Sequence, residues 1–121
     1  MRVSKRWLSV LPHYDSEKRK ERRYTLHMPV RVTVPADRNA VFDALSDNIS
    51  AHGILLQTNH PLDEGIAVRL LIKVPPTPAH SHLTGVGTVV RASKASFDSY
   101  VLAVCCHKRP FLLKKLGIPG L

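Results

Sequence analysis

The sequence predicts an all-β domain built as a small six-stranded antiparallel barrel. Apolar and polar residues alternate in several short stretches, which is the period of a strand that buries one face. Nine prolines are spread over the 121 residues and the apolar runs are short, which favours many short strands over long helices. The stretches also follow one another at the spacing of strands joined by turns, as in small barrels.

The fourth of these stretches has the cleanest alternation, with apolar residues at every second position from Ile66 to Val74. In the first stretch, Val30, Val32 and Val34 alternate with residues that are polar or proline. These patterns predict that one face of each strand lies in the core. The six strands are expected over residues 28–34, 41–50, 54–58, 66–74, 83–92 and 99–106.

The segments between the strands carry turn signals. Residues 35–39 predict a turn and residues 59–65 a loop, because both contain proline, glycine or short polar residues. The prolines within residues 75–78 end the fourth strand, since proline cannot donate to a strand ladder. Residues 93–98 are expected to form the loop of a final hairpin, and residues 110–116 resemble a short amphipathic C-terminal helix.

The length fits one domain whose core needs neither disulfides nor a metal. We expect an N-terminal extension over residues 1–18, the folded domain over 19–116 and a C-terminal tail over 117–121. Cys105 and Cys106 are adjacent on a predicted strand, where their side chains face opposite sides, which argues against a structural disulfide and fits a reducing cytosol. No apolar run is long enough for a membrane span or a signal peptide, so a cytoplasmic protein is expected.

The positive charge is concentrated near the N-terminus. Residues 1–27 carry eight Lys or Arg and three acidic residues, so more than half of the net charge of +9 lies on less than a quarter of the chain. A basic arm of this kind indicates an anionic partner such as a nucleotide, a nucleic acid, an acidic protein or a lipid surface. The alternative is a solvated basic tail. The Trp7 segment within it either docks a partner or packs on its own barrel.

A polar motif at the end of the second predicted strand complements this arm. The segment reads Asn48-Ile49-Ser50-Ala51-His52-Gly53. On a strand, Asn48 and Ser50 would share one face while Ile49 points to the core. Gly53 would give the backbone the φ freedom to turn, or would let a ligand approach closely. A flexible basic arm beside a polar strand edge suits a small, doubly anionic ligand.

Residues 48–53 resemble the (Asp/Asn)-x-Ser-x-x-Gly motif of PilZ domains, a family of bacterial receptors for cyclic di-GMP. The second motif of that family is Arg-x-x-x-Arg, just before the first strand. Arg23 matches its first arginine, and His27 stands where the second would be. Arg19 and Arg23 also have the spacing of the motif, but this pair lies earlier in the chain than the pair of Arg23 and His27. Arg22 adds a further guanidinium. The resemblance extends over roughly residues 19–112.

The resemblance implies a receptor without enzymatic activity. Arg23 would grip a guanine or a phosphate, Asn48 and Ser50 would contact a guanine edge, and Gly53 would permit close approach. Arg19 and Arg22 would assist from the arm. Ligand binding would pull the arm onto the barrel and change contacts with an unidentified protein partner, with no metal and no cofactor other than the ligand. The implied ligand-binding residues are Arg19, Arg22, Arg23, His27, Asn48, Ser50 and Gly53.

His27 departs from the family pattern, which leaves alternatives open. An imidazole is mostly neutral at pH 7 and lacks the bidentate fork of arginine, so the loss of one charge-assisted contact would cost about 1.5 to 3 kcal/mol. Binding is then either weakened and pH-sensitive, or lost in a domain that keeps only protein contacts. A nucleic-acid-binding barrel is less favoured, because the chain has seven aromatic residues and no pair recurs at alternate strand positions.

Overall fold

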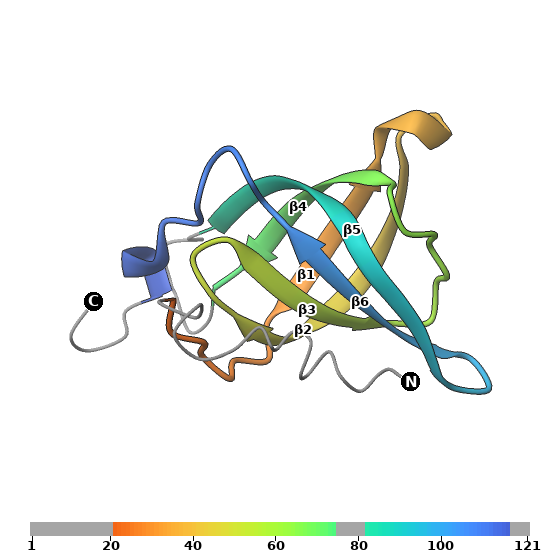
Figure 1. Cartoon of the computed structure of the whole chain (residues 1–121), viewed down its shortest axis with the longest axis horizontal. Helices are drawn as coiled ribbons and strands as arrows, with labels where there is room; N and C mark the ends of the chain where they lie inside the picture. Colours follow the sequence, from red (N-terminus) through yellow and green to blue (C-terminus); the bar gives the residue numbers. More distant parts are fainter. Residues whose placement is uncertain (1–20, 75–81, 117–121) are drawn as a thin grey trace.

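The computed structural model of the chain describes residues 21–74 and 82–116. Within these residues six antiparallel strands form a closed barrel in the order β1-β2-β3-β6-β5-β4 (Figure 1). This architecture confirms the predicted fold class. The strands are β1 (Pro29–Val34), β2 (Ala40–Ile49), β3 (Gly53–Thr58), β4 (Ala67–Lys73), β5 (His82–Ser96) and β6 (Ser99–Cys105).

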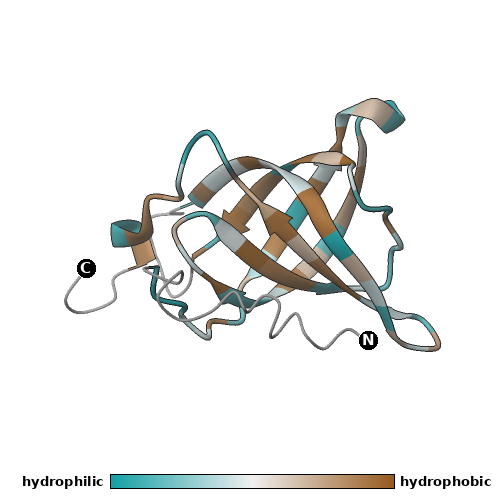
Figure 2. Ribbon diagram, in the orientation of Figure 1, coloured by the Kyte–Doolittle hydropathy of each residue, from teal (hydrophilic) through white to brown (hydrophobic). Residues whose placement is uncertain are grey.

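β1 closes the barrel because it has a partner on each side. Val30 lies opposite Ala44 of β2 and also opposite Ile72 of β4. Alternate residues of each strand face inward, and Figure 2 shows the apolar residues recurring along the strands. The buried apolar core consists of Met28, Val30, Val32, Val34, Ile49, Ile54, Leu56, Val68, Leu70, Ile72, Val74, Leu83, Val89, Leu102, Val104, Cys106 and Phe111.

A β-bulge interrupts β2 just before the polar motif. Ala44 packs against the core and Ser46 is buried, but the pairing with β3 shifts by one residue between Ser46 and Asn48. The extra residue, Asp47, reverses the inward face, so that Ile49 is fully buried. The prediction that Ile49 faces the core is therefore confirmed. Uninterrupted alternation from Ala44 would have turned Asn48 inward instead.

The final hairpin is longer than the sequence indicated. β5 continues to Ser96 and pairs there with Ser99, so the turn contains only Phe97 and Asp98. The prediction of a loop over residues 93–98 was wrong. Ser93, Lys94 and Ser96 pair with β6 through their backbones. The side chains of residues 93–98 are exposed, so no apolar alternation marks this end of the strand.

The C-terminal segment covers one end of the barrel. Instead of an amphipathic helix over residues 110–116, the chain forms a single 3₁₀ turn at Leu113–Leu116. Phe111 is buried ahead of this turn, and its ring packs over the backbone of Gly85 in β5. A Cβ atom on Gly85 would lie only 2.5 Å from the Phe111 ring, so this packing requires glycine.

Both cysteines are free, in agreement with the prediction that they form no disulfide. Burial raises the pKa of the Cys106 thiol to about 11. Burial also raises the pKa of Cys105, with a further contribution from the charge of Glu21. In the described part of the chain no helix is long and apolar enough to cross a bilayer. The predicted extension over residues 1–18, the tail over 117–121 and Trp7 lie outside the described residues.

We predict that Gly85→Ala destabilises the domain by about 1 to 3 kcal/mol, because the added methyl group would overlap the Phe111 ring. Chemical denaturation should show a lower midpoint with an unchanged slope. Thr84→Ala, at an exposed neighbouring position on β5, serves as the control and should have a smaller effect. A Gly85→Ala protein as stable as the parent would show that Phe111 does not pack rigidly against this strand.

Candidate functional site

The N-terminal arm, which we define as residues 21–28 for the described part of the chain, runs beside the end of β2. The N–H of Tyr24 donates to the carbonyl of Ile49 at 2.8 Å, and the N–H of Ile49 donates to the carbonyl of Tyr24 at 2.9 Å. Directly opposed residues share a face, so Tyr24 packs against the core with Ile49. The same alternation turns Asn48 away from the core, where it is half-buried, and Arg23 is exposed. The prediction that Ser50 shares the outward face of Asn48 was wrong, because Ser50 follows the last residue of β2 and its side chain is buried in the turn.

Ser46 of β2 bonds to the C-terminal end of the arm. Its backbone N–H donates to the Met28 carbonyl at 2.9 Å, and its hydroxyl accepts from the Met28 N–H at 2.8 Å. The same hydroxyl donates to the carbonyl of Leu26. Ser46 is almost completely buried, so these bonds satisfy polar groups that water cannot reach. The bulge at Asp47 thus lies between two points at which the arm is bonded to β2.

His27 is tied to the strand between these two points. Its Nδ1–H donates to the Ser46 carbonyl at 3.1 Å, and the same nitrogen lies 4.0 Å from a carboxylate oxygen of Asp47. Because a carbonyl only accepts, Nδ1 carries the proton and Nε2 is an acceptor in the neutral ring. The residue in the place of the second motif arginine is therefore partly engaged by β2, although its side chain is 57% exposed.

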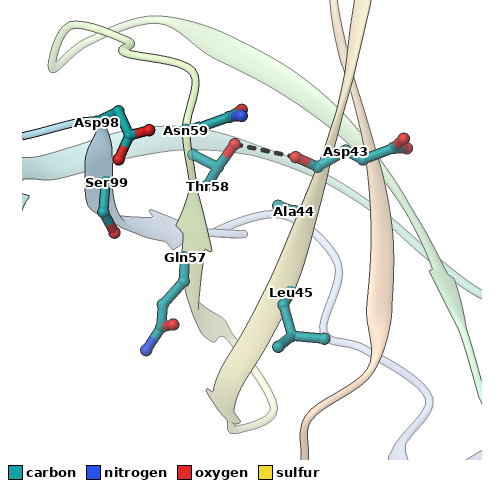
Figure 3. A pocket seen from close by; sticks show the side chains of 8 residues that line it. All are labelled: Asp43, Ala44, Leu45, Gln57, Thr58, Asn59, Asp98 and Ser99. Atoms are coloured by element: carbon teal, nitrogen blue, oxygen red, sulfur yellow. Dashed lines mark hydrogen bonds between the residues drawn. The ribbon is translucent and has the colours of Figure 1, made fainter.

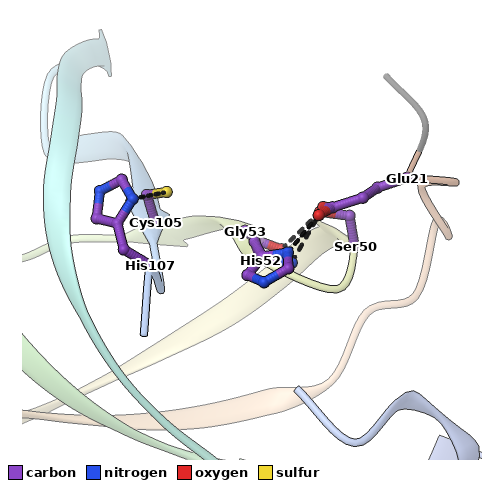
Figure 4. Close-up of polar contacts among 6 residues, drawn as sticks. All are labelled: Glu21, Ser50, His52, Gly53, Cys105 and His107. Atoms are coloured by element: carbon purple, nitrogen blue, oxygen red, sulfur yellow. Dashed lines mark hydrogen bonds and ion pairs between the residues drawn. The ribbon is translucent and has the colours of Figure 1, made fainter. Parts of the chain in front are cut away.

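Glu21 reaches across to the turn that follows β2. One carboxylate oxygen accepts from the backbone N–H of His52 at 3.1 Å, and the other meets Nδ1 of the His52 ring (Figure 4). Burial raises the pKa of the Glu21 carboxyl, but hydrogen bonds from His52 and Ser50 outweigh burial and hold the pKa below its ordinary value of 4.5. The turn thus stabilises the charged carboxylate.

The turn itself, residues 50–53, is held by backbone bonds on several sides. The N–H of Ser50 donates to the Gly53 carbonyl at 2.8 Å. The carbonyl of His52 accepts from Cys106 at 2.8 Å, and that of Ala51 accepts from Phe111 at 2.7 Å. The C-terminal segment therefore fixes the turn from one side while the arm contacts it from the other.

Gly53 does not use the φ freedom expected of it. Among the glycines that the structure describes, only Gly65 has a positive φ. A Cβ atom at Gly53 would meet the Ser50 hydroxyl at 3.6 Å and the Val104 carbonyl at 3.5 Å, which are ordinary contacts. The expectation that the turn requires glycine there was wrong, because Gly53 already begins the extended strand β3. Close approach of a ligand remains the prediction for this position.

The pairing of Tyr24 with Ile49 sets the backbone of Arg23 beside residues 48–50, and the backbone of Ser50 is bonded to that of Gly53. Arg22 and Arg23 are both exposed, and Arg19 lies outside the described residues. Sequence reasoning did not assign roles to Glu21, Ser46 or His52 in this site. No periodicity or motif links Glu21 to His52 over 31 residues, so only the fold shows their contact.

A pocket lies on the outer side of β2 and β3, beside the start of β6 (Figure 3). Its lining includes the carboxylates of Asp43 and Asp98 and no lysine or arginine, so it does not suit an anionic ligand. Within the described residues, no group of three or more His, Cys, Asp or Glu side chains could hold a metal ion. The residues lining the pocket are Asp43, Ala44, Leu45, Gln57, Thr58, Asn59, Asp98 and Ser99.

Comparison with known proteins identifies the domain type that the motif resembles. The PilZ domain family model matches residues 17–109. Comparison with curated protein sequences gives no match. Among solved structures, the Bacillus subtilis inhibitor of motility (MotI/DgrA) superposes with a TM-score of 0.63 at 18% identity, covering 82% of this chain and 46% of that chain. The present chain therefore spans about half the length of MotI/DgrA.

Two isolated PilZ domains are also similar. The PilZ domain of CeSA from a cellulose-synthesizing bacterium has a TM-score of 0.51 at 14% identity, covering 79% of this chain and 88% of that one. The PilZ domain of YcgR from Escherichia coli, solved with c-di-GMP, has a TM-score of 0.50 at 16% identity, covering 78% of each chain. At these identities the likeness establishes the fold.

We predict that His52→Ala raises the pKa of Glu21, because burial then acts with fewer hydrogen bonds to oppose it. Carbon-detected NMR of the Glu21 carboxyl during an acid titration would measure the shift. In the parent, the contact should stabilise the fold above about pH 4.5 and lose this contribution as the pH falls through the lowered pKa. His60→Ala is the control, and an unchanged Glu21 titration in His52→Ala would contradict the contact.

Proposed function

Because the chain belongs to the PilZ domain family, we propose that it is a cytoplasmic, non-enzymatic receptor for cyclic di-GMP. Ligand binding would change the position of the arm and thereby the contacts of the domain with a partner protein. The observation that carries this proposal is the bridge between Tyr24 and Ile49, which sets the backbone of Arg23 beside the motif residues Asn48 and Ser50. The related PilZ domain of YcgR was solved with c-di-GMP, which supports the choice of ligand.

The chemistry of these three side chains suits the ligand. Cyclic di-GMP presents two phosphates and two guanines, and an arginine fork can pair bidentately with a phosphate or with the O6/N7 edge of guanine. Arg23 is exposed on the arm and is available for either contact. Asn48 supplies both a donor and an acceptor for a guanine edge, and the Ser50 hydroxyl adds a further polar contact. Arg22 and Arg19 would add positive charge from the same arm.

A diverged function is the second candidate, and one observation favours it. The ring of His27 bonds to the Ser46 carbonyl, so the place of the second motif arginine is taken by a group already engaged with β2. Such a domain would keep the barrel and the arm but act only through protein contacts. The related MotI/DgrA is described as an inhibitor of motility, and a protein target is proposed for the present chain in either case.

We predict that Arg23→Ala and Asn48→Ala each weaken cyclic di-GMP binding by about 10- to 150-fold, since each removes a hydrogen bond to a charged or polar ligand group. Isothermal titration calorimetry near pH 7 at physiological salt would measure this, with GTP as the ligand control. Arg69→Ala, an exposed arginine on β4, is the protein control and should bind as the parent does. No heat from the parent up to high-micromolar ligand would favour the diverged function.

We also predict that His27→Arg tightens binding by about 10- to 150-fold, because it restores a charge-assisted, bidentate donor. The gain should shrink as salt is raised. Thr84→Arg adds the same charge on an exposed part of β5 and separates a specific contact from general attraction. Equal affinities for His27→Arg and the parent would place residue 27 outside the site.

A further inference from the structure

The turn after β2 directs several hydrogen-bond donors at one negatively charged group. The backbone N–H and the ring Nδ1 of His52 each meet a different oxygen of the Glu21 carboxylate. The Ser50 hydroxyl, which donates to the Gly53 carbonyl at 3.5 Å, makes a smaller contribution to lowering the pKa of this carboxylate. These groups come from a turn fixed by the bonds to Cys106 and Phe111, so the donors are held in place. An arrangement of this kind is a preformed receptor for an oxyanion.

The receptor lies within the proposed ligand site. Glu21 stands two residues before Arg23 on the arm, and Ser50 is both a donor in the turn and a member of the polar motif. Figure 4 shows the Glu21 side chain reaching from the arm toward Ser50 and His52. An acidic side chain is thus bound where the resemblance implies an anionic ligand. Its side chain is 38% exposed, so the contact is accessible from solvent.

This inference rests on the proposed function and extends it. We propose that the turn of residues 50–53 receives a phosphate of cyclic di-GMP, that His52 is a further ligand-binding residue, and that Glu21 occupies this receptor in the unliganded protein. The family motif leaves the position of His52 undefined, whereas here its N–H and its ring both engage an anion.

A phosphate fits the receptor better than a guanine does. The carboxylate of Glu21 presents two oxygens that share one negative charge, and a phosphodiester presents two non-bridging oxygens with the same charge. The guanine edge offers the neutral acceptors O6 and N7, which gain less from a donor set that stabilises charge. Placing a phosphate at the turn would leave the guanine edges to Asn48 and Arg23.

Glu21 and a phosphate cannot occupy the receptor together. The Glu21 carboxylate and a phosphate would compete for the same N–H groups of His52. Two negative charges bound to one set of donors would also repel each other. Ligand binding therefore displaces the Glu21 carboxylate from the turn, while the bonds between Tyr24 and Ile49 keep Arg23 beside the motif. The measured affinity is lowered by the fraction of molecules in which Glu21 holds the receptor. The arm thus inhibits binding through Glu21 and promotes it through Arg23.

Calorimetry with cyclic di-GMP on a set of matched variants tests the inference. Glu21→Gln keeps the shape of the side chain and removes its charge, and we expect it to bind about 5- to 30-fold more tightly than the parent. Glu64→Gln, in the loop between β3 and β4 at the other end of the barrel in Figure 1, changes the net charge equally and should have no effect. Adding His52→Ala to Glu21→Gln should weaken binding about 5- to 30-fold.

The outcomes separate this inference from the proposed function. Tighter binding by Glu21→Gln than by the parent supports the proposed function and the role of Glu21. This holds even if the parent binds too weakly to give measurable heat. If the parent binds and Glu21→Gln binds equally, the role of Glu21 is overturned and the receptor function stands. If His52→Ala has no effect in the Glu21→Gln background, the role of His52 is overturned. If no variant binds, the proposed function fails and the phosphate receptor with it. Thermal melting of each variant, and Glu21→Ala as a second substitution, exclude misfolding.

Discussion

The site depends on the pairing of the arm with the end of β2 around the bulge at Asp47. The bulge turns Ile49 into the core, and the buried Ile49 then offers its backbone to Tyr24. Without the extra residue, alternation along β2 would bury Asn48 and send Ile49 outward. One inserted residue therefore determines which side of the strand carries the motif, and the arm takes its register from the same place.

Opposing charges on the arm match the two roles proposed for it. Arg23 and Arg22 are exposed cations suited to an anionic ligand, while Glu21 next to them is bonded to the turn beside the motif. An arm with arginines alone would have no anion of its own for the donors of His52 in the absence of ligand. With Glu21 present, those donors bond to a carboxylate in the free protein instead of to water.

The sequence predicted the barrel because strand alternation is a local property. Residues such as Val30 and Leu70 repeat every second position, and their burial follows directly. The bulge at Asp47 and the extended end of β5 left no such signal, since one depends on pairing with β3 and the other is exposed on both faces. In the site, motif spacing indicated Arg23, Asn48 and Ser50, whereas the contact of Glu21 with His52 arises only from the folded path of the chain.

Closure of the barrel has a consequence for the arm. Every strand, including β1, already has two neighbours within the sheet, so the arm completes no part of it. Displacing residues 21–23 would break the contact of Glu21 with His52 and would leave the strand ladders and the two backbone bonds between Tyr24 and Ile49 intact. The residues proposed to move thus take no part in the sheet or the core, whereas Tyr24, Leu26 and Met28 pack in or against the core. The position of residues 21–23 can therefore change with little effect on the stability of the barrel.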